Sequence, residues 1–448
     1  MASCRCRLHR ASDAIVVFQN SLVNATTNAK RCDMRTQIVD SKIEALDGIR
    51  GAAVLMVMLY HFAHVTRVSH SGIDAIFYKV ALTGWVGVDI FFALSGFLIS
   101  GILLRSKNSD GYLRSFYGRR ALRIFPLYYL YLGFLFFVLY PLISNKVSGA
   151  ESAKVAAALD AWPWFVFYLS NVKQAIAGVF FGAGAGHLWS LAIEEQFYFI
   201  WPLIVLLASE IALIYVCIGL LFLGLIVRIY LSMHGVSPEV IYVFTPGRID
   251  GLISGSLLAV FVHRNLLRPT CFLLKGPPAA FLLFIVALIA FGSRAEASPL
   301  IYTVGFSILA LIVAGLINSA RYSSTRSVFR TRALMLMGKY SYALYIIHPI
   351  IREAALRMLG KPRLLFGSQL PWQVAFSAGC VCMSIIAALI SWHIVEKHFM
   401  ALKDRLFPHR DLGSPAFGGH KPRSRAESPG NFEVIDPNRN ATAKTPPI

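Results

Sequence analysis

The sequence predicts an all-α polytopic membrane protein with about ten transmembrane helices in one bundle. Of its 448 residues, 56% are hydrophobic and only 15% are charged. Apolar runs of about 20 residues, long enough to cross a bilayer as a helix, recur from Leu46 to Val395. The formal net charge of +20 lies beside these runs and in the two tails. A basic excess in such positions indicates membrane topology, so we do not expect nucleic-acid binding.

The apolar pattern divides into ten predicted spans, with both chain termini in the cytosol. These spans are 46–65, 84–104, 122–143, 188–207, 209–232, 247–263, 279–292, 299–318, 334–355 and 374–395. In this topology most basic loop residues face the cytosol, for example Arg105, Arg264 and Arg330. The stretch 158–172 is too short and too broken to be an eleventh span, so we interpret it as a re-entrant or interfacial segment.

One membrane domain, residues 41–400, is predicted between two polar ends. Residues 1–40 and 401–448 are expected to be disordered cytosolic segments, because they contain too few apolar side chains to form a core. Cys4, Cys6 and Cys32 cluster in the first segment, but their spacing matches no zinc pattern. We therefore expect free thiols and no bound metal.

Two ionisable residues on the first predicted span are the most informative feature of the chain. Arg50 and His61 are eleven residues apart. This is nearly three helical turns, so both side chains lie on one face, about 16 Å apart along the axis. Ionisable groups inside a spanning helix are costly, which indicates a functional role. Asp47 is expected to pair with Arg50 at a spacing of three residues.

Several other predicted spans are more polar than a bilayer-crossing helix should be. The polar segments are 87–97, 119–129, 187–198, 247–251 and 339–349. Together with residues 46–61, and in this order, they resemble the acyltransferase-3 family of integral membrane acyltransferases. The resemblance covers nearly all of residues 43–400. It implies transfer of an acyl group, usually acetyl, from a cytosolic acyl-CoA to a hydroxyl of a cell-envelope or exported carbohydrate.

The resemblance also implies which residues act. In this family an arginine and a histidine separated by ten residues on the first span are functional, and they match Arg50 and His61. The other matching motif positions are Phe91, Phe92, Ser95, Gly96, Arg120, Arg123, Ser190 and Glu194. The usual setting of the family favours the bacterial inner (plasma) membrane. Many members carry an esterase-like extracellular domain after the spans, and we predict none in this chain.

The chemistry of acyl transfer agrees with these matches. A neutral histidine suits a general base, so we assign that role to His61. Guanidinium groups bind phosphates well, so Arg50, Arg120 and Arg123 are predicted to hold the acyl-CoA donor, without a metal. Glu194 is expected to orient His61 or to bind the acceptor sugar. Further acceptor contacts are predicted for Ser95, Ser190, Arg248, Asp250, Tyr342 and His348.

Some of these polar residues also fit structural roles. His348, followed by Pro349, could instead be a hydrogen-bonded cap at a helix kink. Arg248 and Asp250 could pair with each other or with Glu194. Two other classes of protein fit the buried charges: a transporter or flippase for an envelope glycan, and a non-catalytic membrane component of an envelope-assembly complex. Hydrolysis or transfer of acetyl-CoA by the purified protein would separate the transferase from both.

Overall fold

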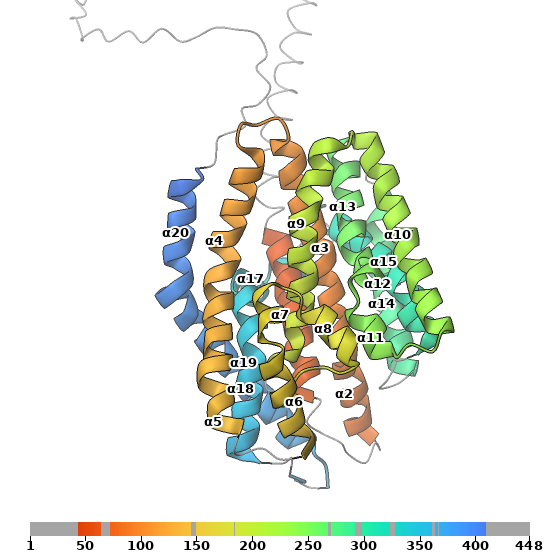
Figure 1. The fold of residues 1–448 in the computed structure, drawn as a ribbon. Helices are drawn as coiled ribbons and strands as arrows, with labels where there is room; N and C mark the ends of the chain where they lie inside the picture. The colour runs from red at the N-terminus through yellow and green to blue at the C-terminus, as the bar shows by residue number, and fades with distance from the viewer. Residues whose placement is uncertain are drawn as a thin grey trace, which may run out of the picture. The chain divides into compact units, whose positions relative to one another are not determined.

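The computed structural model describes residues 44–63, 72–144, 149–182, 184–267, 270–291, 298–322, 328–360, 363–365 and 367–408. Within these ranges the chain forms an all-α bundle without β-strands (Figure 1). The predicted extension 1–40, with Cys4, Cys6 and Cys32, lies outside the described residues. The same holds for residues 409–448 of the predicted tail.

In the described part of the chain, eight helical stretches are long and apolar enough to cross a membrane. They are Glu44–Ala63, Gly72–Ser106, Tyr112–Ser144, Gly186–Leu207, Glu210–Met233, Cys271–Phe291, Ile301–Ala320 and Leu370–Leu406. Each overlaps a predicted span. The other two predicted spans, 247–263 and 334–355, correspond to elements that are either too short or not apolar enough to be counted among the eight. These are α12 (Thr245–Arg248), α13 (Asp250–His263), α17 (Arg332–Lys339) and α18 (Ser341–Leu359). The predicted class of all-α polytopic membrane protein is confirmed.

Five of the eight stretches combine two or more helical segments, and in one of them the 3₁₀ turn Gly186–Leu188 precedes α9 (Trp189–Leu207). A 3₁₀ turn, Thr83–Trp85, joins α2 (Gly72–Leu82) to α3 (Val86–Ser106). π-helical turns join α4 (Tyr112–Gly133) to α5 (Tyr140–Ser144), precede α15 (Phe306–Ala320), and join α19 (Leu370–Ser391) to α20 (Lys397–Leu406). The remaining long helices are α10 (Glu210–Met233) and α14 (Cys271–Phe291). Because α20 reaches Leu406, residues 401–406 are helical rather than disordered.

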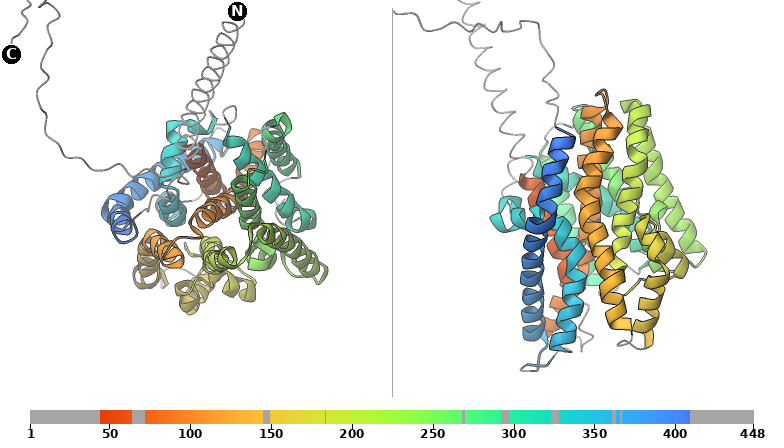
Figure 2. Two further views of the ribbon diagram at one scale, coloured as in Figure 1. Left: turned by 90° about the horizontal axis from the view of Figure 1, so that it is seen from above. Right: turned by 60° about the vertical axis from the view of Figure 1, so that its left-hand side comes forward.

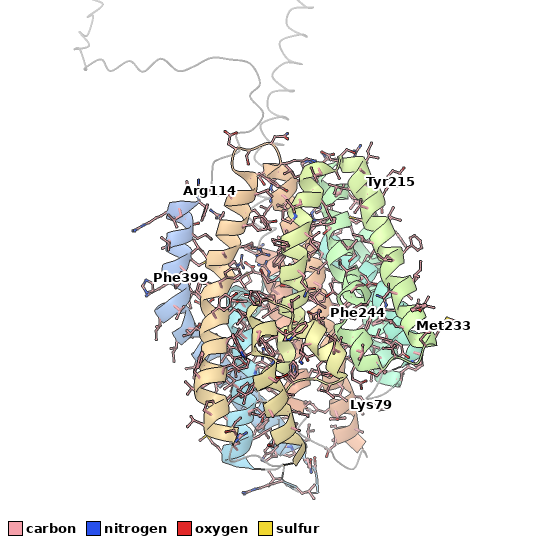
Figure 3. All side chains as sticks on the ribbon, in the orientation of Figure 1. Lys79, Arg114, Tyr215, Met233, Phe244 and Phe399 are labelled. Atoms are coloured by element: carbon pink, nitrogen blue, oxygen red, sulfur yellow. The ribbon has the colours of Figure 1, made fainter. Side chains whose placement is uncertain are left out.

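The helices divide into an inner and an outer group. The buried share is 56% for the first helix, Glu44–Ala63, and 67% for the stretch that contains α3, but only 6% for α14 and 17% for α10. Seen along the bundle, the first helix and α3 lie among the other helices (Figure 2). Tyr215 and Met233 project outward from α10 (Figure 3) and are 71% and 80% exposed. A bundle surface of exposed apolar side chains is what a bilayer requires.

The inner helices α3 and α13 pack with their backbones in close contact. A Cβ atom at Gly96 of α3 would overlap the carbonyl oxygen of Leu252 in α13. Small residues at such crossings let two membrane helices approach closely. The predicted span 247–263 is itself divided, because α12 ends at Arg248 and α13 begins at Asp250. This division sets the places of two ionisable side chains described below.

The chain between α5 and α9 folds back against the bundle in three short helices. These are α6 (Gly149–Asp160), α7 (Trp162–Val166) and α8 (Ser170–Ala177). In Figure 1, α7 and α8 lie between the two ends of the bundle. Phe165 and Ser170 are fully buried. The segment therefore enters the protein without crossing it, which agrees with the re-entrant interpretation of 158–172.

Candidate functional site

Arg50 and His61 belong to two clusters of polar side chains inside the bundle. The arginine cluster contains the guanidinium groups of Arg50, Arg120 and Arg123, together with Asp47, Glu194 and Tyr198. The histidine cluster contains the rings of His61, His187 and His348, together with Ser190 and Tyr345. The first helix and α9 each contribute to both clusters.

The first helix is held in place by backbone contacts at its start. A Cβ atom at Gly51 would overlap the carbonyl oxygen of Leu334 in α17. A Cβ atom at Gly338, also in α17, would overlap the carbonyl oxygen of Asp47. Close approach on this scale is possible only with glycine, which has no side chain to displace the neighbouring backbone. The positions of Asp47 and Arg50 relative to α17 are therefore fixed by the main chain.

The arginine cluster brings together all three residues predicted to bind the donor. Arg50 pairs with Asp47 at 3.0 Å, as expected from the spacing. The Arg120 guanidinium lies over the ring of Tyr198, 4.1 Å from its centre. Arg123 lies close enough to Arg50 and Arg120 for their charges to repel. Asp47 and Glu194 supply counter-charge within the cluster, and guanidinium groups gathered in this way are suited to bind an anionic ligand.

Glu194 belongs to the arginine cluster and lies on its side toward the histidine cluster. Its Oε2 accepts a hydrogen bond of 3.2 Å from the Tyr198 hydroxyl, and its charge interacts with those of Arg120, Arg50 and Arg123. It is also an electrostatic neighbour of Tyr345 in the histidine cluster. Glu195 likewise interacts with Arg120, and its Oε1 is buried without a hydrogen bond to any described residue. Neither carboxylate points to the outside of the bundle.

Two residues predicted to bind the acceptor lie instead near the arginines. Ser95 forms a hydrogen bond with the hydroxyl of Tyr198, the residue beneath Arg120. The Tyr342 hydroxyl donates to the carbonyl of Ile124 at 2.7 Å, next to Arg123 in α4. The structure therefore places Ser95 and Tyr342 at the predicted donor end of the site. From the sequence alone this end could not be distinguished from the acceptor end.

The histidine cluster is built around a direct contact between two imidazoles. His61 Nδ1 lies 3.2 Å from His348 Nε2 and 2.9 Å from the carbonyl oxygen of Val57. His348 Nδ1 lies 3.0 Å from the carbonyl oxygen of Leu344, which can only accept a hydrogen bond. A neutral His348 is therefore protonated on Nδ1, and its Nε2 shares the Nδ1–H of His61 with the carbonyl oxygen of Val57. This arrangement leaves the lone pair of a neutral His61 on its own Nε2.

His187 is the third ring of this cluster, and the sequence analysis did not assign it a role. Its ring centre lies 5.5 Å from that of His348 and 5.4 Å from that of Tyr345. The Tyr345 hydroxyl contacts the His187 carbonyl at 3.2 Å and the Ser190 hydroxyl at 2.5 Å. One feature of the sequence could have identified His187 as a site residue. It stands at the start of the polar segment 187–198, three residues before Ser190.

One face of α9 connects the clusters. Ser190, Glu194 and Tyr198 follow one another at intervals of four residues, so they form a stripe along the helix. His187 precedes the stripe, eleven residues before Tyr198, which corresponds to about 16 Å along the helix. The same interval separates Arg50 from His61 on the first helix. The two helices run in opposite directions and carry the same two groups of side chains.

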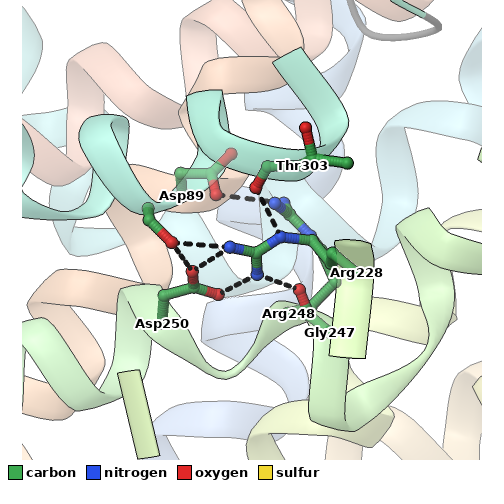
Figure 4. Close-up of polar contacts among 7 residues, drawn as sticks. Asp89, Arg228, Gly247, Arg248, Asp250 and Thr303 are labelled. Carbon is green, nitrogen blue, oxygen red and sulfur yellow. Dashed lines mark hydrogen bonds and ion pairs between the residues drawn. The ribbon is translucent and has the colours of Figure 1, made fainter. Parts of the chain in front are cut away.

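Arg248 and Asp250 bind partners that the sequence analysis did not propose (Figure 4). Arg248 pairs with Asp89 of α3 at 3.0 Å, and Asp250 pairs with Arg228 of α10 at 2.7 Å. All four side chains are almost completely buried. The suggestion that Arg248 and Asp250 pair with each other or with Glu194 was wrong. The reason is that α12 ends between them, which directs one side chain to α3 and the other to α10.

Arg228 is held by more groups than its ion pair alone. Its guanidinium donates to the carbonyl oxygens of Thr303 at 2.8 Å and Gly247 at 2.5 Å, and to the Ser307 hydroxyl at 2.6 Å. Ser307 in turn donates to Asp250 at 2.8 Å. Arg228 is the one charged residue of the apolar run 211–232, and that isolated charge was the signal for its role.

Comparison with known proteins shows the family of this chain. Residues 43–392, which include every residue of both clusters, match the model of the acyltransferase-3 family, described as an acyltransferase domain. The chain belongs to the acyltransferase-3 family. No solved structure matches this acyltransferase-3 chain. Helix α20 lies beyond the matched region and is joined to α4 by an ion pair of 3.3 Å between Arg119 and Asp404.

Named relatives of this acyltransferase-3 chain are known from bacteria. It is 32% identical over 333 residues to the peptidoglycan O-acetyltransferase OatA of Listeria monocytogenes, covering 69% of this chain and 49% of that protein. It is 29% identical over 398 residues to YrhL of Bacillus subtilis, provisionally named a peptidoglycan O-acetyltransferase, covering 82% and 57%. A provisionally named O-acetyltransferase of Staphylococcus aureus is 30% identical over 383 residues, covering 80% and 57%. The chain thus spans about half the length of these relatives.

Proposed function

We propose that this protein is a membrane O-acyltransferase that moves an acetyl or other short acyl group from a cytosolic acyl-CoA to a hydroxyl of a cell-envelope or exported carbohydrate. The observation that carries the proposal is the pairing of the two clusters. A group of arginines and a pair of hydrogen-bonded histidines lie at the two ends of one helix face, about 16 Å apart. The names of the relatives support a carbohydrate acceptor.

The arginine cluster is the proposed donor end. An acyl-CoA carries several phosphates at one end and its thioester at the end of a long, thin arm. Arg50, Arg120 and Arg123 would bind the phosphates, since guanidinium groups form paired hydrogen bonds with phosphate oxygens. The Asp47 carboxylate holds Arg50, and the ring of Tyr198 supports Arg120. We further propose that both chain termini and the loop between α3 and α4 lie on the cytosolic side, where the donor is present.

The histidine cluster is the proposed reaction end. His61 Nε2 would accept the proton of the acceptor hydroxyl as its oxygen attacks the thioester carbon. The C–O bond forms, the C–S bond breaks, and the proton passes from His61 to the leaving thiolate, which releases a thiol and an ester. The Val57 carbonyl oxygen and His348 Nε2 both accept from the Nδ1–H of His61, which keeps the lone pair on Nε2 and favours the protonated ring during the reaction.

The remaining predicted residues take different roles in this proposal. Ser190 and Tyr345 form a hydrogen-bonded pair next to the histidines and would line the acceptor side. Ser95 and Tyr342 belong to the donor side. Glu194, on the side of the arginine cluster toward the histidine cluster, would hold Arg120 and Tyr198 in place. Arg248 and Asp250 are assigned to the buried ion pairs rather than to the acceptor.

A cell-based experiment tests the function, since the acceptor is then supplied by the envelope itself. The chain is expressed in a bacterial host, and ester-bound acetate released from the envelope glycans by mild alkali is measured beside mass spectrometry of the glycans. We expect the chain to raise glycan-bound acetate and the His61→Ala variant to give the level of the empty vector. The purified protein should also transfer or hydrolyse the acetyl group of acetyl-CoA.

Two outcomes would contradict the proposal. A change in the amount of exported glycan without a change in its acetate content would indicate a transporter or flippase. Full glycan acetylation in cells whose membranes contain the His61→Ala protein would show that the base lies elsewhere, and His348 would become the next candidate.

A further inference from the structure

His187 is a buried imidazole with two unused nitrogens. Only 7% of the residue is exposed, and neither Nδ1 nor Nε2 forms a hydrogen bond with any residue that the structure describes. The carbonyls of Tyr345 and Ile346 lie near the ring, but not in the geometry of a hydrogen bond. Buried polar atoms are normally paired, because leaving one unpaired costs free energy. Two unpaired atoms on one ring indicate that a partner is supplied from elsewhere.

The surroundings of His187 place that partner at the reaction end of the site. The ring of His187 packs against those of His348 and Tyr345, and His61 is an electrostatic neighbour. The backbone at His187 is held firmly, because its carbonyl accepts hydrogen bonds from Ser190 and Tyr345. The ring is thus fixed in position while its polar atoms remain available, which is the arrangement expected of a preorganised binding group.

We propose that His187 binds the carbohydrate acceptor, donating a hydrogen bond from one ring nitrogen and accepting one at the other. This inference rests on the proposed function. A neutral imidazole has one donor and one acceptor on opposite edges of the ring, so a single oxygen cannot satisfy both. A glycan that runs past the ring offers hydroxyl groups that both donate and accept. A thioester carbonyl only accepts, and would leave one nitrogen of His187 unpaired.

A bound metal ion fits this ring less well. In the described ranges, no group of three or more His, Cys, Asp or Glu side chains is arranged to hold one, even though three histidines lie in the cluster.

A purely structural role makes a different prediction from acceptor binding. If His187 only fills space, replacing it by an apolar ring should be neutral or stabilising, since the unpaired polar atoms disappear.

The test compares His187→Phe with His187→Gln. Phenylalanine keeps a flat ring but has no polar atoms, whereas the glutamine amide has both a donor and an acceptor. Ser170→Ala is the matched control, because the Ser170 hydroxyl is also buried without a partner among the described residues but lies in α8. Each variant is expressed in cells in which the unchanged chain acetylates envelope glycans, and the initial rate of glycan acetylation is measured. Acetyl-CoA binding and the thermal midpoint are measured on the purified proteins.

We expect His187→Phe to lower the rate of glycan acetylation roughly 10- to 100-fold, as expected when buried hydrogen bonds to a substrate are lost. Acetyl-CoA binding should stay within about twofold, and the thermal midpoint should be equal or higher. His187→Gln should recover part of the loss, and Ser170→Ala should match the unchanged chain. If His187→Phe does not fold, His187→Met replaces it as the apolar variant.

Three results would overturn the inference. The first is a glycan acetylation rate for the folded apolar variant within about twofold of the unchanged chain, which would make His187 a packing residue. The second is a loss of acetyl-CoA binding in that variant, which would place His187 at the donor. The third is equal activity of the glutamine and apolar variants. If the unchanged chain itself acetylates no glycan, the proposed function fails, and that result is separate from these three.

Discussion

The buried ion pair between Arg228 and Asp250 allows a quantitative test of whether these residues hold the fold or bind a substrate. Both side chains are inside the bundle, with 0% and 2% of their surface exposed, and their closest atoms are 2.7 Å apart. Removing one member of such a pair leaves an uncompensated buried charge, which typically costs about 3–5 kcal/mol. Removing both charges together costs much less, because no charge is left in the interior.

We therefore expect Asp250→Leu and Arg228→Met each to lower the free energy of unfolding by about 3–5 kcal/mol. The double variant should lose well below the sum of the two, with a coupling energy of about 2 kcal/mol or more. The carbonyls of Thr303 and Gly247 lose a donor in the double variant, so some cost remains. Unfolding of the purified protein by SDS in mixed micelles, followed by tryptophan fluorescence, measures all three values.

Glycan acetylation of the same variants separates the two roles. A structural pair predicts that the double variant, assayed where it is folded, keeps most of its activity. Additive losses of stability, with no coupling, would refute the argument that the two residues act as a unit. A folded double variant without activity would return Asp250 to the acceptor site, where the sequence analysis had placed it.

Three further outcomes follow from the geometry of the first helix. His61→Ala should reduce transfer about 10²- to 10⁴-fold while leaving acetyl-CoA binding intact, which steady-state kinetics and equilibrium binding measure. Arg50→Ala should weaken acetyl-CoA binding about 10-fold or more, and Asp47→Ala should weaken it less, because the guanidinium remains. Gly51→Leu should lower the thermal midpoint sharply, since even a Cβ atom would overlap the Leu334 carbonyl.

Each of these has a contrary result, and the glycine test also has a control. Near-normal turnover of His61→Ala would remove it as the base. Unchanged acetyl-CoA binding in Arg50→Ala would make the arginine a structural partner of Asp47. Gly219→Ala in α10 is the control for the glycine test, because nothing lies within 4 Å of a Cβ atom there. An equal midpoint for Gly51→Leu and Gly219→Ala would show that the first helix and α17 are not packed as described.

Residues joined by local spacing could be predicted from the sequence. The Asp47–Arg50 pair follows from helical periodicity, and the face shared by Arg50 and His61 follows from the same rule. The class of fold follows from the length and number of the apolar runs. The gathering of Arg50 with Arg120 and Arg123 rested on the family motifs, because no periodicity relates the first helix to α4.

Contacts between distant helices could not be predicted. His187, in the turn that precedes α9, meets His348 of α18 only because the two segments lie side by side in the bundle, and the sequence does not state which segments are neighbours. The same holds for Arg248, whose polar character was evident but whose partner, Asp89, lies on α3. A charged residue inside a membrane segment indicates that a partner or ligand exists. It does not identify that partner, so a binding role and a structural role look the same in the sequence.

The backbone contacts at Gly51 and Gly338 have a mechanical consequence. Because the start of the first helix is wedged against α17, this helix has little freedom to slide or turn. The distance between Arg50 and His61 is therefore constant and is set by three helical turns. Under the proposed function, a donor whose phosphates bind at Arg50 would bring its thioester to His61 only if its arm has the matching length. Under the same proposal, tolerance for longer acyl groups would come from the surrounding helices and not from movement of the first helix.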